Sequence, residues 1–473
     1  MDIRERLNII YNDSKKNHRK PIKAINFQGI NLDLSRNIIT SDILVKMYDL
    51  LRHFKFTEKR KQLFTNKLFS NTESQTVSFV SYRNSKSYDK DIDRMTKLYL
   101  NIKNNKINNY NGEKITNIVH IGIGGSILGP KFLSDALESF KEKSFDTYFV
   151  SSGDLDEISD LFKKINVNKT LFIFVSKSFK TSETIRIKSY IDKYIKTNLP
   201  KYASHIFKNQ YVAVTANKEL CNKQNFTNRN IFSLIKTIPG RFSVASPVTL
   251  ITMFEIGIKN YKAFVNGIQS MDNHFYRCRV KDNLPINLAL ISIWNINFLS
   301  KYANIIVPYS YRLRNLTNYI QQIEMESNGK SVINDGKRTL NFTSPIIFGT
   351  SGTECQHSFF QAAHQGTIDV FFDFIYVKNL NTDSKKFLAA NVLAQADLLF
   401  KGMKTKIPYK ELVGCSPSNL IGIDKISPDR IGKIMSLYEH KVFVEGIIWQ
   451  INSYDQWGVE AAKILAKKNL SKH

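Results

Sequence analysis

Short apolar runs alternate with longer amphipathic segments from residue 115 onward. Four runs, ITNIVHIGIG, DTYFVSS, TLFIFVS and YVAVTA, occupy 115–124, 146–152, 170–176 and 211–216, and helical segments begin near residues 129, 155 and 181. Almost wholly apolar strands separated by helices are typical of a parallel sheet covered on both faces. The pattern therefore predicts an α/β domain over 111–282.

The same alternation returns in the second half of the chain. The runs ANIIVPY, IIFGT and DVFFDFIYV occupy 303–309, 346–350 and 369–377, with helical segments between them. We therefore expect a second α/β domain over 283–425, with its own mainly parallel sheet. The fold class is α/β, with two such domains and a helical C-terminal tail.

The two ends of the chain lack this alternation. In ILVKMYDLLRHF at 43–54, the apolar residues Ile43, Met47, Leu50 and Leu51 recur on one helical face. Residues 1–110 are therefore predicted to be mostly helical, and we assign them no chemistry. In the tail, 426–473, the sequence predicts two helices that are separated by a break at INSYDQ.

Composition narrows the class of protein. The 473 residues include 68 Lys and Arg against 41 Asp and Glu, a formal charge of +27, but the lysines are spread from Lys15 to Lys472. Scattered charge favours an ordinary solvated surface, or a field that attracts a small anionic substrate, over a nucleic-acid interface. Four isolated cysteines, no apolar leader in MDIRERLNII and no long apolar run predict a cytoplasmic protein that contacts no membrane.

A glycine-rich turn, HIGIGGSILGP at 120–130, follows the first predicted strand and opens a helix. Glycine lets a ligand approach the backbone closely. The dinucleotide fingerprint needs a third glycine where Ile127 stands, so a nicotinamide site is disfavoured. A tight turn without a ligand is the alternative, but Ser126 at the expected helix start favours binding.

A second loop, VSKSFKTSET at 175–184, gathers hydroxyl groups at the end of another predicted strand. Ser176, Ser178 and Thr181 could donate hydrogen bonds to a phosphate monoester at a helix N-terminus. An ordinary N-cap would explain one or two of these hydroxyls. Lys180 adds positive charge inside the loop, and we predict that it modestly strengthens phosphate binding. GKS at 329–331 is no P-loop, because Glu324 stands where that motif needs a glycine.

Five further residues become candidates for catalysis only when they are considered together. Helical spacing in 308–331 places Gln322 and Glu326 one turn apart. Arg241 in GRFS could place a permanent cation beside a developing oxyanion. His357 and His364 are seven residues apart, about two helical turns, and either could be only structural; we see no set of ligands for a metal.

The motifs GIGGSILGP, SKSFKTSET, GRFS, QQIEMESNGK, QHSFFQAAHQGT and EGIIWQINSYDQWGVEAAK occur in this order. In this arrangement the chain closely resembles the glucose-6-phosphate isomerase (phosphoglucose isomerase) family over about 115–468. The resemblance implies two sugar-isomerase (SIS) domains, a homodimer, no cofactor, and reversible conversion of glucose 6-phosphate into fructose 6-phosphate, a step of glycolysis and gluconeogenesis.

The resemblance also implies roles for individual residues. Glu326 would move a proton between C2 and C1 through a cis-enediolate, with Arg241 beside the charge. His364, reaching the site from the partner subunit, would open the ring, with Lys463 near the ring oxygen. The implied substrate-binding residues are Gly125, Ser126, Ser176, Lys177, Ser178, Thr181, Gln322 and Gln456.

Helical offsets of four and three predict that Gln456, Glu460 and Lys463 share one face of the tail helix. A non-catalytic phosphosugar-binding regulator on the same fold is the alternative function. Such a protein could keep the hydroxyl loop, but it would have no need to retain four residues together: Glu326, Arg241, His364 and Lys463.

Overall fold

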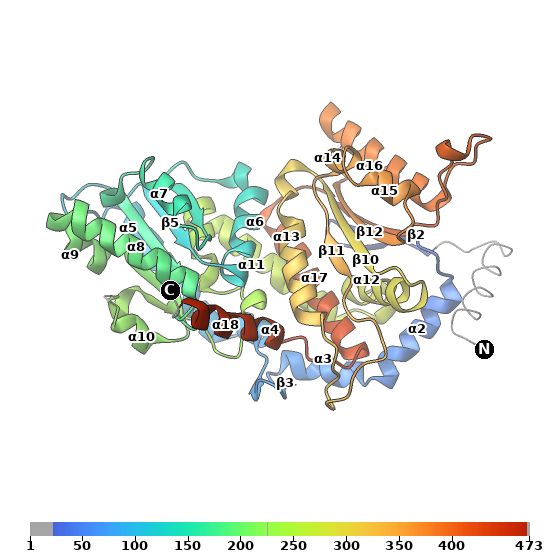
Figure 1. Ribbon diagram of the computed structural model, residues 1–473, viewed down its shortest axis with the longest axis horizontal. Coiled ribbons are helices and arrows are strands. Elements are labelled where there is room, and N and C mark those ends of the chain that lie inside the picture. Colours follow the sequence, from blue (N-terminus) through green and yellow to red (C-terminus); the bar gives the residue numbers. More distant parts are fainter. Residues whose placement is uncertain (1–21, 225, 471–473) are drawn as a thin grey trace.

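The computed structural model describes residues 22–224 and 226–470, and Figure 1 shows two sheets at opposite ends of an elongated molecule, with helices between them. The N-terminal sequence from which we expected no secretory signal lies outside the described residues. Within the described part of the chain, no helix has the length and apolar character needed to cross a membrane.

The first sheet has five parallel strands in the order β6-β5-β7-β8-β9. Their bounds are Asn117–Ile121 (β5), Asp146–Val150 (β6), Thr170–Val175 (β7), Tyr211–Thr215 (β8) and Ile231–Ser233 (β9). Alternate residues pack into two different cores: Ile173 faces the centre of the molecule, whereas Phe172 and Phe174 pack under the outer helices. The predicted parallel sheet is therefore confirmed.

The helices of this half begin and end as follows: Leu128–Ala136 (α6), Asp156–Phe162 (α7), Ser182–Asn198 (α8), Pro200–Asn209 (α9) and Lys218–Asn222 (α10). Apolar residues of α7, α8 and α9 cover the outer face of the sheet, and those of α6 cover the inner face. Strand ends and helix starts thus meet at the loops that carry the candidate site residues.

The second sheet has six strands in the order β1-β2-β13-β12-β10-β11. Their bounds are Ile25–Phe27 (β1), Ile30–Arg36 (β2), Ala303–Tyr309 (β10), Ile346–Phe348 (β11), Val370–Val377 (β12) and Ser418–Ile423 (β13). The last four are parallel, and β2 joins β13 in antiparallel orientation. The N-terminal region therefore also supplies strands, which we did not predict, although Ile30, Leu32 and Leu34 alternate with polar residues.

The helices beside this sheet are Leu284–Ile293 (α12), Leu316–Gln321 (α13), Gly352–Gln356 (α14), Phe360–Gln365 (α15) and Asp383–Lys401 (α16). The N-terminal region adds Ser41–His53 (α2), Phe56–Phe64 (α3), Phe79–Arg83 (α4), Lys86–Lys103 (α5) and a small hairpin of Phe69–Ser70 (β3) and Gln75–Thr76 (β4). In α2, Leu44, Met47 and Leu51 are buried.

Two long helices, Leu250–Arg277 (α11) and Pro428–Ile448 (α17), cross between the sheets (Figure 1). Their backbones approach closely at Gly432, where a Cβ atom would collide with the carbonyl oxygen of Phe264. The first tail helix is thus part of the core, because nearly every residue of α17 is buried. After the predicted interruption, Glu460–Leu470 (α18) forms the last helix.

Candidate active site

Three backbone segments from distant parts of the chain meet between the sheets. They are the 3-10 turns Gly124–Ser126 and Gly240–Phe242 and the π-helical turn Gln322–Glu326 that continues α13. A Cβ atom at Gly125 would lie 2.5 Å from the carbonyl carbon and oxygen of Gly240. Glycine at this position is therefore what allows the turn after β5 to lie directly against the segment that carries Arg241.

Arg241 is the best-anchored side chain of the site. Its Nε donates to Ser327 Oγ at 2.6 Å, and its two terminal nitrogens donate to Gln456 Oε1 at 3.0 Å, to the carbonyl oxygen of Ser453 at 2.7 Å and to that of Asp455 at 2.9 Å. Burial lowers the pKa of Arg241, and the charges of Glu326 and Asp455 oppose that effect. The guanidinium is thus fixed before any ligand arrives.

Glu326 lies beside this cation. Its Oε1 is 3.3 Å from Arg241 Nη1, and its Oε2 accepts a hydrogen bond from Gln322 Nε2 at 2.8 Å. The side chain keeps 27% of its surface exposed, whereas that of Arg241 keeps 1%. The carboxylate is therefore oriented by two neighbours and still open to a ligand. Single π-helical turns recur at functional sites in proteins.

Lys330 is a site residue that the sequence analysis missed. Its ammonium donates to the carbonyl oxygens of Glu326 at 2.6 Å, Ser327 at 2.8 Å and Asp455 at 3.0 Å. Its pKa is lowered to about 8, chiefly by burial and then by the charge of Arg241, while the charges of Asp455 and Glu326 oppose the shift. Lys330 therefore satisfies the free carbonyl groups at the end of the turn that carries Glu326.

A buried ionic network connects the π-helical turn Gln322–Glu326 to α17. Glu324 accepts from Lys441 Nζ at 2.8 Å, and Lys441 also lies 2.7 Å from Glu445 in α17. Asn328 donates to Glu324 and accepts from Ser453 Oγ at 2.7 Å. Burial raises the pKa of Glu445, and the nearby charge of Glu324 raises it further. The π-helical turn is thus tied both to α17 and to the segment that holds Arg241.

The hydroxyl loop forms a compact turn between β7 and α8. Ser176 Oγ and Thr181 Oγ1 lie 2.9 Å apart, Ser178 Oγ accepts from the backbone nitrogen of Lys180 at 3.2 Å, and Phe179 has a positive φ of 53°. Thr181 occupies the N-cap of α8, yet among the described residues its side chain forms no capping hydrogen bond. This weighs against a purely capping role and leaves the N–H groups of the first helical turn facing the loop.

Lys177 links the hydroxyl loop electrostatically to Arg241. Burial lowers the pKa of Lys177, the charge of Glu73 opposes this effect, and the charge of Arg241 lowers the pKa further. The loop and the Arg241–Glu326 pair therefore lie within the range of each other's fields. A dianionic group would relieve the repulsion between the two cations.

Gln456 contacts the site, but not in the way that helical spacing predicted. It precedes α18 and has φ −152°, so it lies outside the helix and shares no helical face with Glu460 and Lys463. Within α18, Lys463 pairs with Glu460 at 2.8 Å and keeps 60% of its side chain exposed. The prediction of a common face was wrong because the chain after α17 first passes through a 3-10 turn.

His364 is not brought to Glu326 within one chain. It lies in α15, where its Nε2 is 2.8 Å from Gln395 Oε1 of α16, and it packs edge-on against Phe360. Figure 1 places α15 and α16 at the edge of the second half, away from the helices between the sheets. The other histidine of this segment, His357, ends α14.

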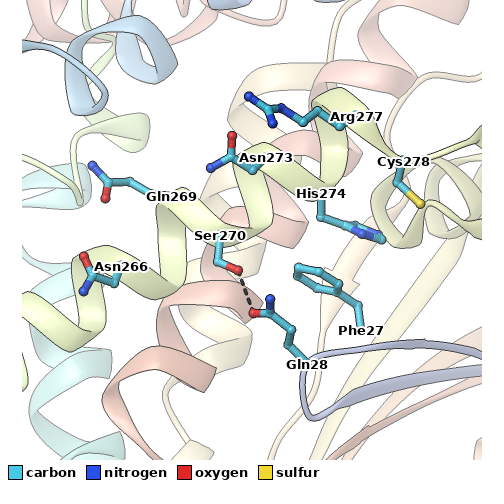
Figure 2. A pocket seen from close by; sticks show the side chains of 9 residues that line it. All are labelled: Phe27, Gln28, Asn266, Gln269, Ser270, Asn273, His274, Arg277 and Cys278. Atoms are coloured by element: carbon cyan, nitrogen blue, oxygen red, sulfur yellow. Dashed lines mark hydrogen bonds between the residues drawn. The ribbon is translucent and has the colours of Figure 1, made fainter.

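A hollow of about 620 Å³ lies apart from these residues. Figure 2 shows it between α11 and the turn of the β1–β2 hairpin, where Gln28 and Ser270 are joined by a hydrogen bond of 2.8 Å. Asn266, Gln269 and Asn273 project along one side of it. Its lining contains none of the predicted site residues, so hollow size alone does not locate the chemistry.

Comparisons with known proteins identify the family of the chain. Residues 33–473 match the model of the family described as phosphoglucose isomerase. The glucose-6-phosphate isomerase of Buchnera aphidicola subsp. Cinara cedri (strain Cc) is 37% identical over 468 residues, which cover 92% of this chain and 85% of that protein. The glucose-6-phosphate isomerase of Helicobacter pylori (strain G27) is 35% identical over 488 residues, which cover 96% and 89%.

A solved structure extends the likeness to the whole fold. The glucose-6-phosphate isomerase of Chlamydia trachomatis D/UW-3/Cx superposes with a TM-score of 0.89 at 27% identity, covering 99% of this chain and 95% of that one. The family match covers almost all of the chain, including the end of β2 and the helices of the N-terminal region. The chain belongs to the phosphoglucose isomerase family.

Proposed function

We propose that the Arg241–Glu326 site carries out the reversible isomerisation of D-glucose 6-phosphate and D-fructose 6-phosphate, an aldose–ketose isomerisation within glycolysis and gluconeogenesis. Family membership and the names of the curated relatives support this reaction. The observation that carries the assignment of residues is the partly exposed Glu326 carboxylate, held 3.3 Å from a buried guanidinium.

Glu326 is the base of the proposed reaction. It takes the proton from C2 of the open-chain aldose and returns it to C1, and a positioned base of this kind contributes on the order of 10²–10⁴-fold. The electron pair released from the C–H bond passes into the C1 carbonyl group and gives a cis-enediolate, in which the hydroxyl proton moves from O2 to O1. Arg241 stabilises the negative charge of this intermediate. Arg241 is already held by its other acceptors, so little reorganisation is needed as the charge develops.

The hydroxyl loop and the glycine-rich turn are proposed to hold the phosphate. The donors are the hydroxyls of Ser126, Ser176, Ser178 and Thr181, the backbone beside Gly125 and the cation of Lys177. Gln322 and Gln456 are proposed to orient the sugar, because each already contacts one member of the Glu326–Arg241 pair. Holding the phosphate and the sugar chain at separate points keeps C1 and C2 within reach of one carboxylate.

Ring opening is assigned to His364 and Lys463, which requires a homodimer. Within one chain His364 contacts Gln395, not Glu326, so a second copy would supply the histidine. We also propose that the site lies where SIS domains 111–282 and 283–425 meet, enclosed by the N-terminal region 1–110 and the tail 426–473. The proposed compartment is the cytoplasm.

The decisive experiment converts fructose 6-phosphate to glucose 6-phosphate in a coupled dehydrogenase assay. Wild-type protein should turn over with EDTA present, and Glu326→Gln should lose about 10²–10⁴-fold in kcat. Binding of 6-phosphogluconate by the variant, followed by calorimetry, should persist. Phosphosugar binding without turnover by the folded wild type would instead support the regulatory alternative.

A further inference from the structure

A second hollow, lined by several cationic side chains, lies beside α9 in the first half of the molecule. It has a volume of about 420 Å³, within the range of small-molecule pockets, and its lining includes Lys201, Lys208 and Arg229. None of the predicted active-site residues lines it. Figure 1 shows α9 at the end of the molecule opposite α15 and α16.

The three cations are not neutralised by the protein. Among the described residues, no carboxylate oxygen lies within 4 Å of Lys201, Lys208 or Arg229. Neither α9 nor 226–230 contains an Asp or Glu. The acidic residue in the adjoining loop, Glu113, is already paired with Lys169 at 2.8 Å. The hollow therefore presents uncompensated positive charge.

Hydrogen bonds hold the floor of this hollow in one arrangement. Arg229 donates to the amide oxygen of Asn209, whose amide nitrogen donates to His205 Nδ1 at 3.1 Å, and His205 Nε2 donates to the carbonyl oxygen of Asn108 at 2.9 Å. These three hydrogen bonds fix the orientation of the His205 ring and of the Arg229 guanidinium. The guanidinium is thus ordered without a carboxylate, and its other N–H groups remain for a ligand.

An aromatic wall completes the hollow. Tyr110 is 50% exposed and meets Tyr202 and His205 edge-on, with ring centroids 5.5 and 6.0 Å away. The Nζ of Lys201 lies 5.8 Å from the Tyr110 ring centroid. Because this cation already lies over the ring, Tyr110 is a poor platform for stacking a nucleobase.

We propose that this hollow is a binding site for a small anion with two or more phosphate groups. Arg229 would hold one phosphate, and Lys201 and Lys208 would neutralise the remaining charge. The site is independent of the phosphate loop between β7 and α8. The compact grouping around one helix, without a stacking platform, favours a small oligophosphate over a nucleic-acid strand.

Calorimetric titration with tripolyphosphate tests the proposal. The full-length wild type is used at low ionic strength with glucose 6-phosphate at saturation, so that the active site is occupied. We expect one tripolyphosphate per chain, weakened at least about tenfold by Lys201→Gln/Lys208→Gln or by Arg229→Gln. The matched control Lys46→Gln/Lys404→Gln removes the same charge from exposed positions elsewhere and should change Kd less than about twofold.

Four results would overturn the proposal, the first three of them from the tripolyphosphate titration. The first is that the wild type does not bind, and the second is that the control pair weakens binding equally. The third is that Ser176→Ala/Thr181→Ala loses binding while the Lys201/Lys208 and Arg229 variants keep it. Tighter binding of a single-stranded oligonucleotide than of tripolyphosphate would also reject a small-anion site. Unchanged isomerase activity and thermal unfolding in Lys201→Gln/Lys208→Gln and in Arg229→Gln show that these variants are folded.

Discussion

The ammonium of Lys330 lies 2.6 Å from the backbone carbonyl oxygen of Glu326, so one residue of the MESNGK segment secures the turn that carries another. The same ammonium reaches Ser327 and Asp455, and Asp455 also accepts from Arg241. Lys330 and Arg241 thus hold the same stretch of backbone from two sides. The carboxylate and the cation of the site cannot move independently.

Lys330→Met should lower kcat by about tenfold with little change in KM, because it removes a positioning contact and no substrate contact. The coupled assay over a range of fructose 6-phosphate concentrations measures both constants. A rise in KM with an unchanged kcat would show that Lys330 serves binding instead.

The same variant reveals a pH dependence of stability. The pKa of Lys330 falls from 10.5 to about 8 on folding. The unfolded chain therefore binds more protons between these values, and the contribution of Lys330 to stability should rise with pH across that window by up to about 3 kcal/mol. Urea unfolding of the wild type and Lys330→Met at pH 7 to 10.5 measures the difference. Parallel curves for the two proteins would contradict the depressed pKa.

Arg241→Met should reduce kcat/KM by about 10²–10³-fold, because the enediolate loses its cation. It also leaves the carbonyl oxygen of Ser453 without its donor, and that of Asp455 keeps only Lys330, so the free energy of unfolding should fall. Arg241→Lys keeps the charge but not the planar set of donors, and it should recover only part of the activity. Full recovery by lysine would show that charge alone suffices.

Gly125→Ala should impair activity while Gly458→Ala does not. A Cβ atom at Gly125 meets the backbone of Gly240 at 2.5 Å, whereas one at Gly458 meets nothing within 4 Å. The added methyl group must push apart the turns that carry Ser126 and Arg241. Kinetics of both variants, compared at equal folded fraction by circular dichroism, test the difference. Equal activity would mean that the two turns can separate without cost.

Lys441→Met should destabilise the fold by about 3–5 kcal/mol, because it leaves buried carboxylates without their cation. Glu324 and Glu445 lie on either side of Lys441. The triple variant Lys441→Met/Glu324→Gln/Glu445→Gln should recover much of the loss, since it removes the unpaired charges. Urea unfolding measures both. A triple variant as unstable as the single one would point to lost packing instead.

Mixing two inactive variants tests the proposed homodimer. A mixed dimer contains one Glu326→Gln chain and one His364→Gln chain. If each active site combines residues of both chains, one site of this dimer carries both defects and the other site is intact. Unfolding and refolding an equimolar mixture should recover about one quarter of wild-type activity. If His364 served its own chain, every site would carry one defect and the mixture would remain inactive.

Local patterns in the sequence predicted the strands and loops best. The runs at 170–176 and 303–309 coincide with β7 and β10 because their residues are apolar on both faces. The pairing of Gln322 with Glu326 also followed from local spacing, and it survives in a π-helical turn. Such features depend on neighbours in the chain, which the sequence displays directly.

Contacts between distant segments could not be predicted in this way. Gln456 reaches Arg241 because it precedes a 3-10 turn, Trp457–Val459. The prediction from helical spacing instead placed Gln456 inside the helix. Lys330 lies beyond the end of a helical turn. Helical periodicity therefore could not predict the direction of its side chain. The alternation in Ile30–Arg36 was a readable signal for β2, but its partner strand lies near the other end of the chain.

The pairing of β2 with β13 affects the order in which the protein can fold during synthesis. The side chain of Asn37 donates to the carbonyl oxygen of Ser418, 381 positions later, just where β2 meets β13. At a synthesis rate of about 5–20 residues per second, β2 leaves the ribosome roughly 20–80 s before its neighbouring strand exists. During translation the five-stranded sheet can form completely, whereas the β1–β2 hairpin still lacks β13, the strand with which it pairs. The β1–β2 hairpin is therefore among the last described parts of the chain to complete its contacts.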